Sequence, residues 1–341
     1  MRIVVAMSGG VDSSVAAALL KEQGHEVCGI HMRLHTGNRS TPGRCCGVED
    51  LLDAKSVCDK IGIPFYMLNM QDVFKRTVID DLVKEYLGGR TPNPCVQCNG
   101  VVKFQAFMQK AKELGADMIA TGHYARTHDG RLFTSRDLAK DQSYFLHPVK
   151  PDVLRSTIFP LGEMDKNAVR QHARRFGLVT AEKSESMEVC FISNDDHTSF
   201  VSDAVPDVDG TGQILDKAGN VLGEHDCYWR FTIGQRKGLG IQGGPWYVID
   251  INADKRQVIV DTSPTAGNLE VKVIKQNWFV PPEQLLGRNL KGCVRHKGAL
   301  APCVVMPGLV VFESLPRSIT PGQSIVVYDE DEVVMGGIIS R

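Results

Sequence analysis

The chain has 341 residues, of which 43% are hydrophobic, and its formal net charge at pH 7 is −1. This length exceeds what one hydrophobic core usually holds, so two or three domains are expected. The near-zero charge excludes a globally basic protein, although a local basic groove for nucleic acid is still compatible with it. No secretory leader and no apolar run of membrane-spanning length are present, so we expect a cytoplasmic protein without a membrane partner.

The first element is a short apolar strand at residues 2–7, followed by a glycine-rich turn and an amphipathic helix. The turn contains Gly9 and Gly10, and we expect Asp12 or Ser13 to cap the helix that follows. Glycines allow the backbone to approach a ligand closely, and the unpaired amides of a helix N-terminus attract anions. Strand, turn and helix together therefore predict a phosphate-binding loop, whereas an isolated Gly-Gly pair would more often only close a crossover.

The complete string narrows the kind of phosphate site. No lysine follows the glycines, which excludes the P-loop of kinases and GTPases, and the glycine spacing differs from that of a dinucleotide site. The string Ser8-Gly9-Gly10-Val11-Asp12-Ser13 resembles the loop of the N-type ATP pyrophosphatases, known as PP-loop enzymes. The resemblance implies cleavage of ATP to AMP and pyrophosphate while a substrate is adenylated.

The periodicity of the next 120 residues predicts alternating strands and helices. Strands are expected at residues 25–32, 64–68 and 117–123, and helices at 48–61, 71–87 and 103–114. This order is typical of an α/β domain with a doubly wound parallel sheet. A hairpin around residue 129 and a helix over 165–176 follow, and from about residue 212 short strands alternate with turn residues. The domains are expected at 1–204 for the ATP-binding catalytic domain, 205–268 for a small central domain and 269–341 for a C-terminal β-barrel.

Three of the ten cysteines stand in a pattern that suggests chemistry. Cys95 and Cys98 form a Cys-x-x-Cys in a segment that two prolines predict to be a loop, and Cys190 follows about ninety residues later. A cytosolic chain keeps its thiols reduced, so metal or sulfur chemistry is favoured over a disulfide framework. A closed zinc site would need a fourth ligand, and a redox pair would need a helix beginning nearer the first thiol. Cys45 and Cys46 have no assignment.

A set of motifs in order along the whole chain resembles the tRNA-specific 2-thiouridylase family. The motifs are Thr91-Pro92-Asn93-Pro94-x-x-x-Cys98-Asn99, Ala120-Thr121-Gly122-His123-Tyr124, Lys140-Asp141-Gln142-Ser143, Cys190-Phe191-Ile192, Gly234-Gln235-Arg236-Lys237-Gly238, Trp246-Tyr247-Val248 and Thr320-Pro321-Gly322-Gln323. The resemblance implies replacement of the C2 oxygen of the wobble uridine by sulfur in tRNAs for Lys, Glu and Gln. It also implies a PP-loop domain, a small central domain and a β-barrel.

The resemblance assigns roles residue by residue. ATP would be held by Ala6, Met7, Ser8, Gly9, Gly10, Val11, Asp12 and Ser13, with adenine or ribose at Met32 and Gly122. Cys98 would be the catalytic cysteine and Cys190 the sulfur-carrying partner. Contacts to tRNA would come from Asn93, Pro94, His123, Lys140, Asp141, Gln142, Arg295, His296 and Gln323. Outside these motifs, a lone histidine or lysine is more often a hydrogen-bonded corner residue or a solvated charge.

The chemistry explains why these parts occur together. A uridine C2 carbonyl is a poor electrophile, so ATP must first adenylate its oxygen, after which sulfur attacks C2 and AMP leaves. Nucleotide, extruded base and sulfur donor must meet within a few ångströms. Mg²⁺ is expected beside the pyrophosphate, with ligands that the sequence does not identify.

One position departs from the family pattern. Many members have an aspartate where this chain has Cys95, and the aspartate is proposed to assist a persulfide relay. The replacement gives a Cys-x-x-Cys plus Cys set, which predicts a [4Fe-4S] cluster on Cys95, Cys98 and Cys190 with one iron open to sulfide. The alternative is the persulfide relay through Cys98 and Cys190. In either case the sulfur donor would be sulfide or a sulfur-carrier protein.

Two other function classes stay open on the residues alone. Another PP-loop ligase or amidotransferase would share the phosphate loop but would not need the three cysteines. A zinc-stapled RNA-binding protein would need the cysteines but not the loop. Pyrophosphate release with and without tRNA separates these classes.

Overall fold

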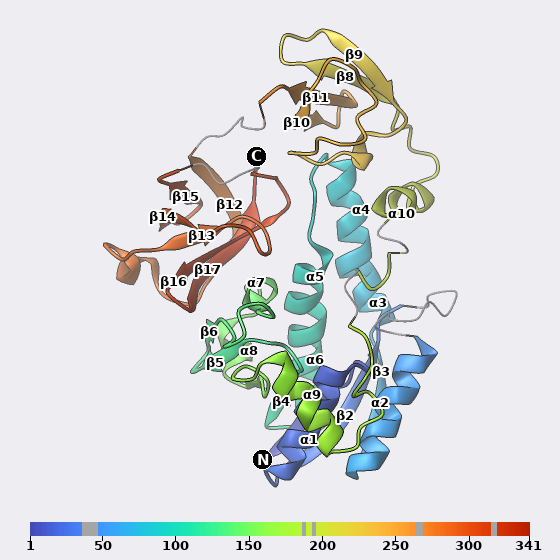
Figure 1. The fold of residues 1–341 in the computed structure, drawn as a ribbon, viewed down its shortest axis with the longest axis vertical. Coiled ribbons are helices and arrows are strands. Elements are labelled where there is room, and N and C mark those ends of the chain that lie inside the picture. The colour runs from blue at the N-terminus through green and yellow to red at the C-terminus, as the bar shows by residue number, and fades with distance from the viewer. Residues whose placement is uncertain (36–46, 186–188, 193–195, 264–268, 315–318) are drawn as a thin grey trace. The chain divides into compact units, whose positions relative to one another are not determined.

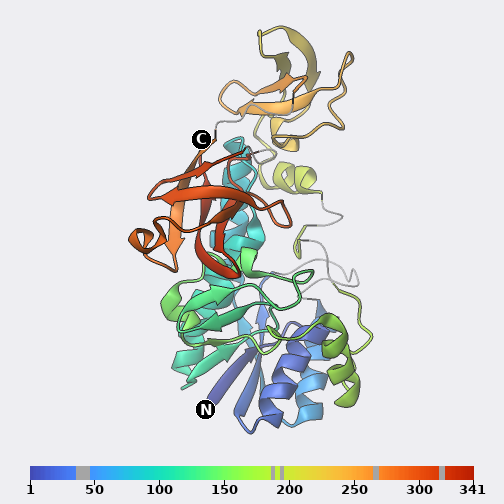
Figure 2. The same ribbon diagram turned by 60° about the vertical axis from the view of Figure 1, so that its left-hand side comes forward.

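The computed structural model describes residues 1–35, 47–185, 189–192, 196–263, 269–314 and 319–341. Cys45 and Cys46 lie outside these ranges. The chain divides into two compact units. The first contains residues Met1–Val78, Cys95–Phe191 and Asp331–Val334, and the second contains Ile79–Pro94, Ile192–Glu330 and Met335–Arg341. Figures 1 and 2 show the elements of both units from two directions.

The first unit is built on a parallel sheet with the strand order β3-β2-β1-β4-β7. Its strands are β1 (Arg2–Ala6), β2 (Glu26–Arg33), β3 (Phe65–Asn69), β4 (Met118–Ala120) and β7 (Thr157–Ile158). The three strands after β1 that were expected from periodicity are present, each within two residues of its predicted start. The chain places β2 on one side of β1 and β4 on the other, so the order reverses at β1. In such a sheet, ligands bind beyond the carboxyl ends of the strands at this reversal point.

Helices cover both faces of the sheet because the central strand is apolar on both sides. Alternate residues of β1, Ile3 and Val5, belong to a core cluster with α1 (Val11–Glu22), α2 (Val48–Ile61) and α9 (Lys166–Arg175). Figure 2 shows these three helices together beside the sheet. Val4, which points the other way, is also buried. The doubly wound α/β prediction is therefore confirmed.

The segment carrying Cys95 and Cys98 is a helix, so the prediction of a loop at residues 90–99 is wrong for its second half. Helix α5 (Pro94–Gln97) continues into the π-helical stretch η2 (Cys98–Ala106) and then α6 (Phe107–Glu113). Pro94 occupies the first helical position, where a missing N–H costs no hydrogen bond. The predicted helix over 71–87 is likewise present as α3 (Gln71–Phe74), η1 (Lys75–Ile79) and α4 (Asp80–Leu87).

The remainder of the first unit consists of a hairpin and several short helices. The predicted hairpin is β5 (Arg126–His128) and β6 (Arg131–Phe133), and β6 pairs with Glu332 and Val333 of β17. Short helices α7 (Ser143–Leu146) and α8 (Pro151–Leu154) follow the hairpin. Asp165 caps α9 by accepting a hydrogen bond from the Ala168 amide at 2.7 Å. The helix expected at 165–176 is thus confirmed.

The second unit contains two β structures. A sheet of order β10-β11-β8-β9 consists of β8 (Gly212–Asp216), β9 (Val221–His225), β10 (Tyr247–Asn252) and β11 (Gln257–Asp261), next to α10 (His197–Ala204) and η4 (Tyr228–Arg230). A barrel follows, with β12 (Glu270–Trp278), η5 (Pro282–Leu285), β13 (Lys291–Cys293), β14 (Ala301–Met306), β15 (Leu309–Phe312), β16 (Ser324–Asp329) and β17 (Glu332–Ile339). Pairing of β12 with β17 closes the barrel. Among the described residues, no helix is long and apolar enough to cross a bilayer.

Candidate functional site

The glycine-rich turn between β1 and α1 has the geometry of an anion cradle. Gly10 is the N-cap of α1, so neither Asp12 nor Ser13 caps the helix as predicted. A glycine cap leaves the first amides of the helix without a side-chain acceptor, and such amides attract anions. The hydroxyls of Ser13 and Ser14 donate to the Gly10 carbonyl oxygen at 3.1 and 2.8 Å. Ser8 is tied to the same turn, since its amide donates to the Ser13 hydroxyl at 3.2 Å.

Two glycines let neighbouring segments close on this turn. Gly9 has a φ of +79°, and a Cβ there would lie 2.2 Å from the Asp50 carbonyl oxygen at the start of α2. At Gly122, just after β4, a Cβ would lie 2.6 Å from the backbone of both Asp12 and Ser13. Any larger residue at either position would push the turn away from its neighbours. Gly122 was predicted to contact the nucleotide, and it also fixes the spacing between β4 and the beginning of α1.

A cavity of about 290 Å³ lies against the turn, at the carboxyl ends of β1, β2 and β4. Of the predicted nucleotide residues, all except Gly9 line it: Ala6, Met7, Ser8, Gly10, Val11, Asp12, Ser13, Met32 and Gly122. His123, Lys140 and Gln142, predicted to contact tRNA, line it as well. Residues more than 100 positions apart in the sequence thus meet at the expected edge of the sheet.

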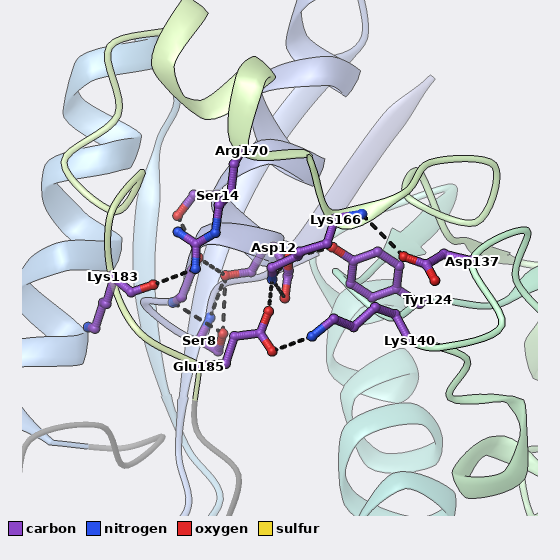
Figure 3. Close-up of polar contacts among 12 residues, drawn as sticks. Ser8, Asp12, Ser14, Tyr124, Asp137, Lys140, Lys166, Arg170, Lys183 and Glu185 are labelled. Carbon is purple, nitrogen blue, oxygen red and sulfur yellow. Dashed lines mark hydrogen bonds and ion pairs between the residues drawn. The ribbon is translucent and has the colours of Figure 1, made fainter. Parts of the chain in front are cut away.

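Charged side chains that the sequence motifs did not indicate form a network of ion pairs beside this cavity. Lys166 Nζ lies 2.7 and 2.9 Å from the two carboxylate oxygens of Asp12 and 2.7 Å from Glu185 Oε1 (Figure 3). Glu185 Oε2 accepts a hydrogen bond from Lys140 Nζ at 2.7 Å. Burial raises the pKa of Glu185, but the hydrogen bonds from both lysines outweigh it and lower that pKa to about 2. Glu185 is therefore ionised throughout the physiological pH range.

A second lysine holds the glycine turn from the opposite side. Lys183 Nζ donates to the Gly9 carbonyl oxygen at 3.1 Å, to Asp50 Oδ1 at 2.7 Å and to Asp53 Oδ2 at 2.5 Å. These hydrogen bonds outweigh the effect of burial and raise the pKa of Lys183. The phosphate loop itself has no lysine, so Lys183 brings a cation to a turn that lacks one. Lys183 was not among the predicted site residues, and the one signal that could have indicated it is the polar run Lys183-Ser184-Glu185 shortly before Cys190.

Tyr124 and His31 complete the polar frame of the cavity. The Tyr124 hydroxyl donates to Asp12 Oδ1 at 2.9 Å, and burial together with the Asp12 charge raises the pKa of the phenol. His31 is buried, and its Nδ1 lies 2.9 Å from the Met7 carbonyl oxygen. Burial lowers the pKa of His31. A neutral imidazole therefore fixes the end of β1, where the turn begins.

The residues predicted to contact tRNA have internal partners as well. His123 Nδ1 lies 2.8 Å from the Thr121 hydroxyl, and desolvation, with a smaller effect of Lys103, lowers the His123 pKa to about 3. The Asp141 carboxylate accepts from the Ser135 amide at 2.8 Å and the Ser143 hydroxyl at 2.6 Å, while burial raises its pKa. Gln142 Oε1 accepts from the Tyr124 amide at 2.9 Å. Each side chain thus shapes the loop that presents it.

In the second unit, Arg295 is exposed and His296 is half-buried, next to β13. Burial, together with Lys297, lowers the pKa of His296. The Gln323 side chain has a partner within the protein, because its Nε2 donates a hydrogen bond to the Thr91 carbonyl oxygen at 2.9 Å. The Thr91 amide in turn donates to the Pro321 carbonyl oxygen at 2.9 Å. The barrel therefore holds the segment that leads to Asn93 and Pro94.

The three cysteines differ in accessibility. Cys95 is exposed in the first turn of its helix, Cys98 is 6% exposed one turn later, and Cys190 is half-buried in the described segment 189–192. Among the described residues, no group of three His, Cys, Asp or Glu side chains is arranged to hold a metal ion. The predicted ligand set for a [4Fe-4S] cluster is therefore not assembled. The sequence could not show that Cys95 and Cys98 share one helix with different exposure.

Comparisons with known proteins agree with this architecture. Three family models match in order: tRNA methyl transferase HUP domain over residues 1–194, tRNA methyl transferase PRC-barrel domain over 198–262 and Aminomethyltransferase beta-barrel domain over 268–339. A solved 4-thiouridine synthetase–RNA complex with bound ATP is similar over 60% of this chain and 50% of that chain, at 15% identity and a TM-score of 0.38. That likeness is too weak to carry a conclusion.

The curated relatives are much closer. The tRNA-specific 2-thiouridylase MnmA of Geotalea uraniireducens is 46% identical over all of this chain and 95% of that protein. The enzyme of the same name from Geobacter metallireducens is 46% identical over 99% of this chain and 96% of that protein. Identity at this level over the full length leaves no room for a different family. The chain belongs to the tRNA-specific 2-thiouridylase family.

Proposed function

We propose that this protein is an ATP-dependent tRNA sulfurtransferase that converts the wobble uridine to 2-thiouridine and releases AMP and pyrophosphate. The observation that carries the proposal is the cavity at the carboxyl ends of β1, β2 and β4, where a PP-loop turn and the Ala120-Thr121-Gly122-His123 corner meet. Family membership supplies tRNA as the substrate class. The tRNAs for Lys, Glu and Gln are the proposed isoacceptors, and the proposed location is the cytoplasm.

In the first step the uridine C2 oxygen attacks the α-phosphorus of ATP, and pyrophosphate leaves. The amides at the beginning of α1 and the hydroxyls of Ser8 and Ser13 are the proposed phosphate donors, with Lys183 supplying positive charge nearby. Met32 and Gly122 are proposed to contact adenine or ribose. Mg²⁺ is proposed to accompany ATP, and Asp12, Asp50 and Glu185 are the carboxylates that line the cavity.

In the second step a sulfur nucleophile attacks C2, and the C2–O bond breaks as AMP leaves. We propose Cys190 as the residue that carries the transferable sulfur as a persulfide and Cys98 as its partner thiol. Attack of the outer sulfur forms a C2–S bond, and attack of the Cys98 thiolate on the Cys190 sulfur then breaks the S–S bond, releases 2-thiouridine and leaves a Cys98–Cys190 disulfide. Sulfide can attack Cys190 in this disulfide, which restores the persulfide and releases Cys98 as a thiol. With a persulfide-bearing sulfur-carrier protein as donor, an external thiol first reduces the disulfide, and the Cys190 thiolate then takes the outer sulfur of the donor.

Cys95, Cys98 and Cys190 do not form a three-donor set among the described residues, and this favours the persulfide relay over the cluster. Cys95→Asp separates the two routes. The relay predicts retained thiolation, since the variant restores the residue common in the family. A cluster would instead make the wild-type protein, purified without oxygen, contain iron and acid-labile sulfide, and Cys95→Asp would lose both together with activity.

Recognition of tRNA is proposed to use Lys140, Asp141, Gln142 and His123 at or beside the cavity, Asn93 and Pro94 at the beginning of α5, and Arg295, His296 and Gln323 in the barrel. Contacts with phosphates make affinity fall steeply with salt even though the net charge is −1. Arg295→Ala should weaken binding and reduce the salt slope by about one unit.

Two measurements test the function. Pyrophosphate release should require an unmodified tRNA, and digestion of that tRNA should yield 2-thiouridine in proportion to the AMP formed when a sulfur donor is present. ATP cleavage that ignores tRNA, or a nitrogen-containing product, would favour another PP-loop ligase and contradict the proposal.

A further inference from the structure

Four charged side chains of alternating sign form a continuous row beside the cavity (Figure 3). Lys140 pairs with Glu185 at 2.7 Å, Glu185 with Lys166 at 2.7 Å, and Lys166 with Asp12 at 2.7 Å. Lys140 belongs to the segment proposed to touch tRNA, and Asp12 belongs to the phosphate loop. The row therefore joins the two places where the substrates are proposed to bind. Lys166 has no role in the mechanism above, and Glu185 has none beyond lining the cavity.

The middle of the row is fixed in position. Lys166 is the first residue of α9, and its side chain is only 13% exposed. Its ammonium lies 5.6 Å from the centroid of the Tyr124 ring, and its backbone amide donates to Asp137 Oδ2 at 3.3 Å. A partly buried ion pair is screened less by solvent than a surface pair. The electrostatic attraction of Lys166 to Asp12 and Glu185 is therefore stronger than that of a surface lysine to its partners.

Helix α9 also holds the segment that ends in Glu185. Arg170, one turn after Lys166, donates to the carbonyl oxygens of Ala181 at 2.5 Å and Lys183 at 3.1 Å. The same helix thus supplies the cation and positions the carboxylate that the cation meets. Removal of charge at Glu185 would break the row without removing these backbone contacts.

Glu185 pairs with both Lys140 and Lys166. A change in one of these two ion pairs therefore alters the strength of the other. A tRNA phosphate that draws Lys140 away would leave Glu185 with Lys166 alone and strengthen that pair. Lys166 would then hold Asp12 less tightly, and the Asp12 carboxylate would become available to the Mg²⁺ ion that is proposed to accompany ATP. Because binding linkage is reciprocal, ATP at Asp12 would favour release of Lys140 toward tRNA to the same extent.

We propose that Lys166 and Glu185 are positioning residues that make ATP binding and tRNA binding mutually reinforcing. The inference rests on the proposed function for its two ligands, but it concerns their coupling and not the thiolation chemistry. Neither residue is required to touch a reacting atom. The expected coupling is about fivefold or more in affinity, the lower part of the usual allosteric range.

The test measures the Kd of α,β-methylene-ATP with Mg²⁺, without tRNA and with saturating unmodified tRNA for Glu. In the wild-type protein tRNA should lower this Kd at least about fivefold. In Glu185→Gln, which keeps the shape but loses the charge, the ratio should fall below about twofold. Glu182→Gln is the matched control, because Glu182 lies three residues earlier and pairs with Arg174 outside the row. It should keep the wild-type ratio.

Variants of Lys166 provide a second test of the coupling between ATP binding and tRNA binding. Lys166→Met should lose the coupling, and Lys166→Arg, which keeps a cation, should recover part of it. The double variant Lys166→Met with Glu185→Gln should be no worse than either single variant, because residues in one network are not additive. Thermal denaturation of each variant checks that the fold is kept.

Three results would overturn the proposal: a wild-type Kd that tRNA does not change, a wild-type ratio retained in both Glu185→Gln and Lys166→Met, or equal loss in Glu182→Gln. Failure of the proposed function looks different. In that case the wild-type protein would form no 2-thiouridine, whatever the binding ratio. Coupled binding with no product would contradict the function alone, and product without coupled binding would contradict the inference alone.

Discussion

The nucleotide cavity and the helix that carries Cys95 and Cys98 are held by different forces. The cavity depends on charge and close backbone contacts: Lys166 and Lys183 bridge four carboxylates, and Gly9 and Gly122 permit the backbone approach. The cysteine helix depends on apolar packing, with Val102, Phe104 and Phe107 fully buried. Its polar anchor is Asn99, whose amide donates to the Phe145 carbonyl oxygen at 3.2 Å.

Because of this difference, substitutions in the two regions should affect different properties of the protein, namely its activity and its stability. The ion pairs at the cavity are only partly buried and lie outside the apolar core, so charge substitutions there should change the chemistry more than they change the stability of the fold. Removing a buried aromatic ring creates a void, so substitutions under the cysteine helix should act through stability.

Asp12→Ala should abolish thiolation and tRNA-dependent pyrophosphate release together, and Ser8→Ala should do the same. Both residues line the cavity at the beginning of α1, where the phosphates are proposed to bind. Pyrophosphate and 2-thiouridine are measured in one reaction, and circular dichroism checks the fold. Near-normal ATP turnover in either variant would remove the phosphate-loop assignment.

Cys98→Ser should abolish only the second step. Thiolation should fall below detection while tRNA-dependent pyrophosphate release continues, because the alcohol cannot take part in sulfur transfer. Cys28→Ser is the control, since Cys28 lies in β2 and has no proposed role. A Cys98→Ser enzyme that still makes 2-thiouridine, or a Cys28→Ser enzyme that does not, would contradict the assignment of the sulfur chemistry.

Phe104→Ala should lower the free energy of unfolding by about 3–5 kcal/mol, the usual cost of removing a buried aromatic side chain. The ring is fully buried and contacts Phe159 at a centroid distance of 5.9 Å. Urea denaturation measures the change. A loss below about 1 kcal/mol would show that the cysteine helix does not depend on this core.

Acid should destabilise the protein through His147, which is 1% exposed. Burial lowers its pKa in the folded state from 6.5 to about 3, so the neutral ring stabilises the fold above pH 6.5 and this contribution is lost as the pH falls toward 3. Between pH 7.5 and 5.5 the loss should be about 1.4 kcal/mol. His147→Asn should remove that part of the pH dependence. Identical pH profiles for both proteins would contradict the assignment.

The parts of the site that depend on the pattern of consecutive residues could be predicted from the sequence. A strand, a glycine-rich turn and a helix can be read from consecutive residues, and the topology of a parallel sheet then places Met32 and Gly122 beside the turn. The prediction failed where local rules compete. Two prolines suggested a loop at Cys95, but Pro94 sits at the first helical position, where proline is favoured.

The row of charged side chains could not be predicted from the sequence, for a different reason. Lys166 and Asp12 are 154 positions apart, and nothing in the local pattern around Lys166 distinguishes it from a solvated lysine. Only the packing of α9 against α1 brings the two together. The three cysteines show the converse: their spacing suggested a shared ligand set, and the described residues do not form one.

The central claim is that ATP activates the uridine oxygen before sulfur replaces it. It can be tested with tRNA that carries ¹⁸O at C2 of the wobble uridine, by mass spectrometry of the AMP formed in a single turnover with sulfur donor present. If the C2 oxygen is adenylated and leaves with the phosphate, each AMP will contain one ¹⁸O and each modified tRNA one sulfur. Unlabelled AMP formed alongside 2-thiouridine would contradict this account.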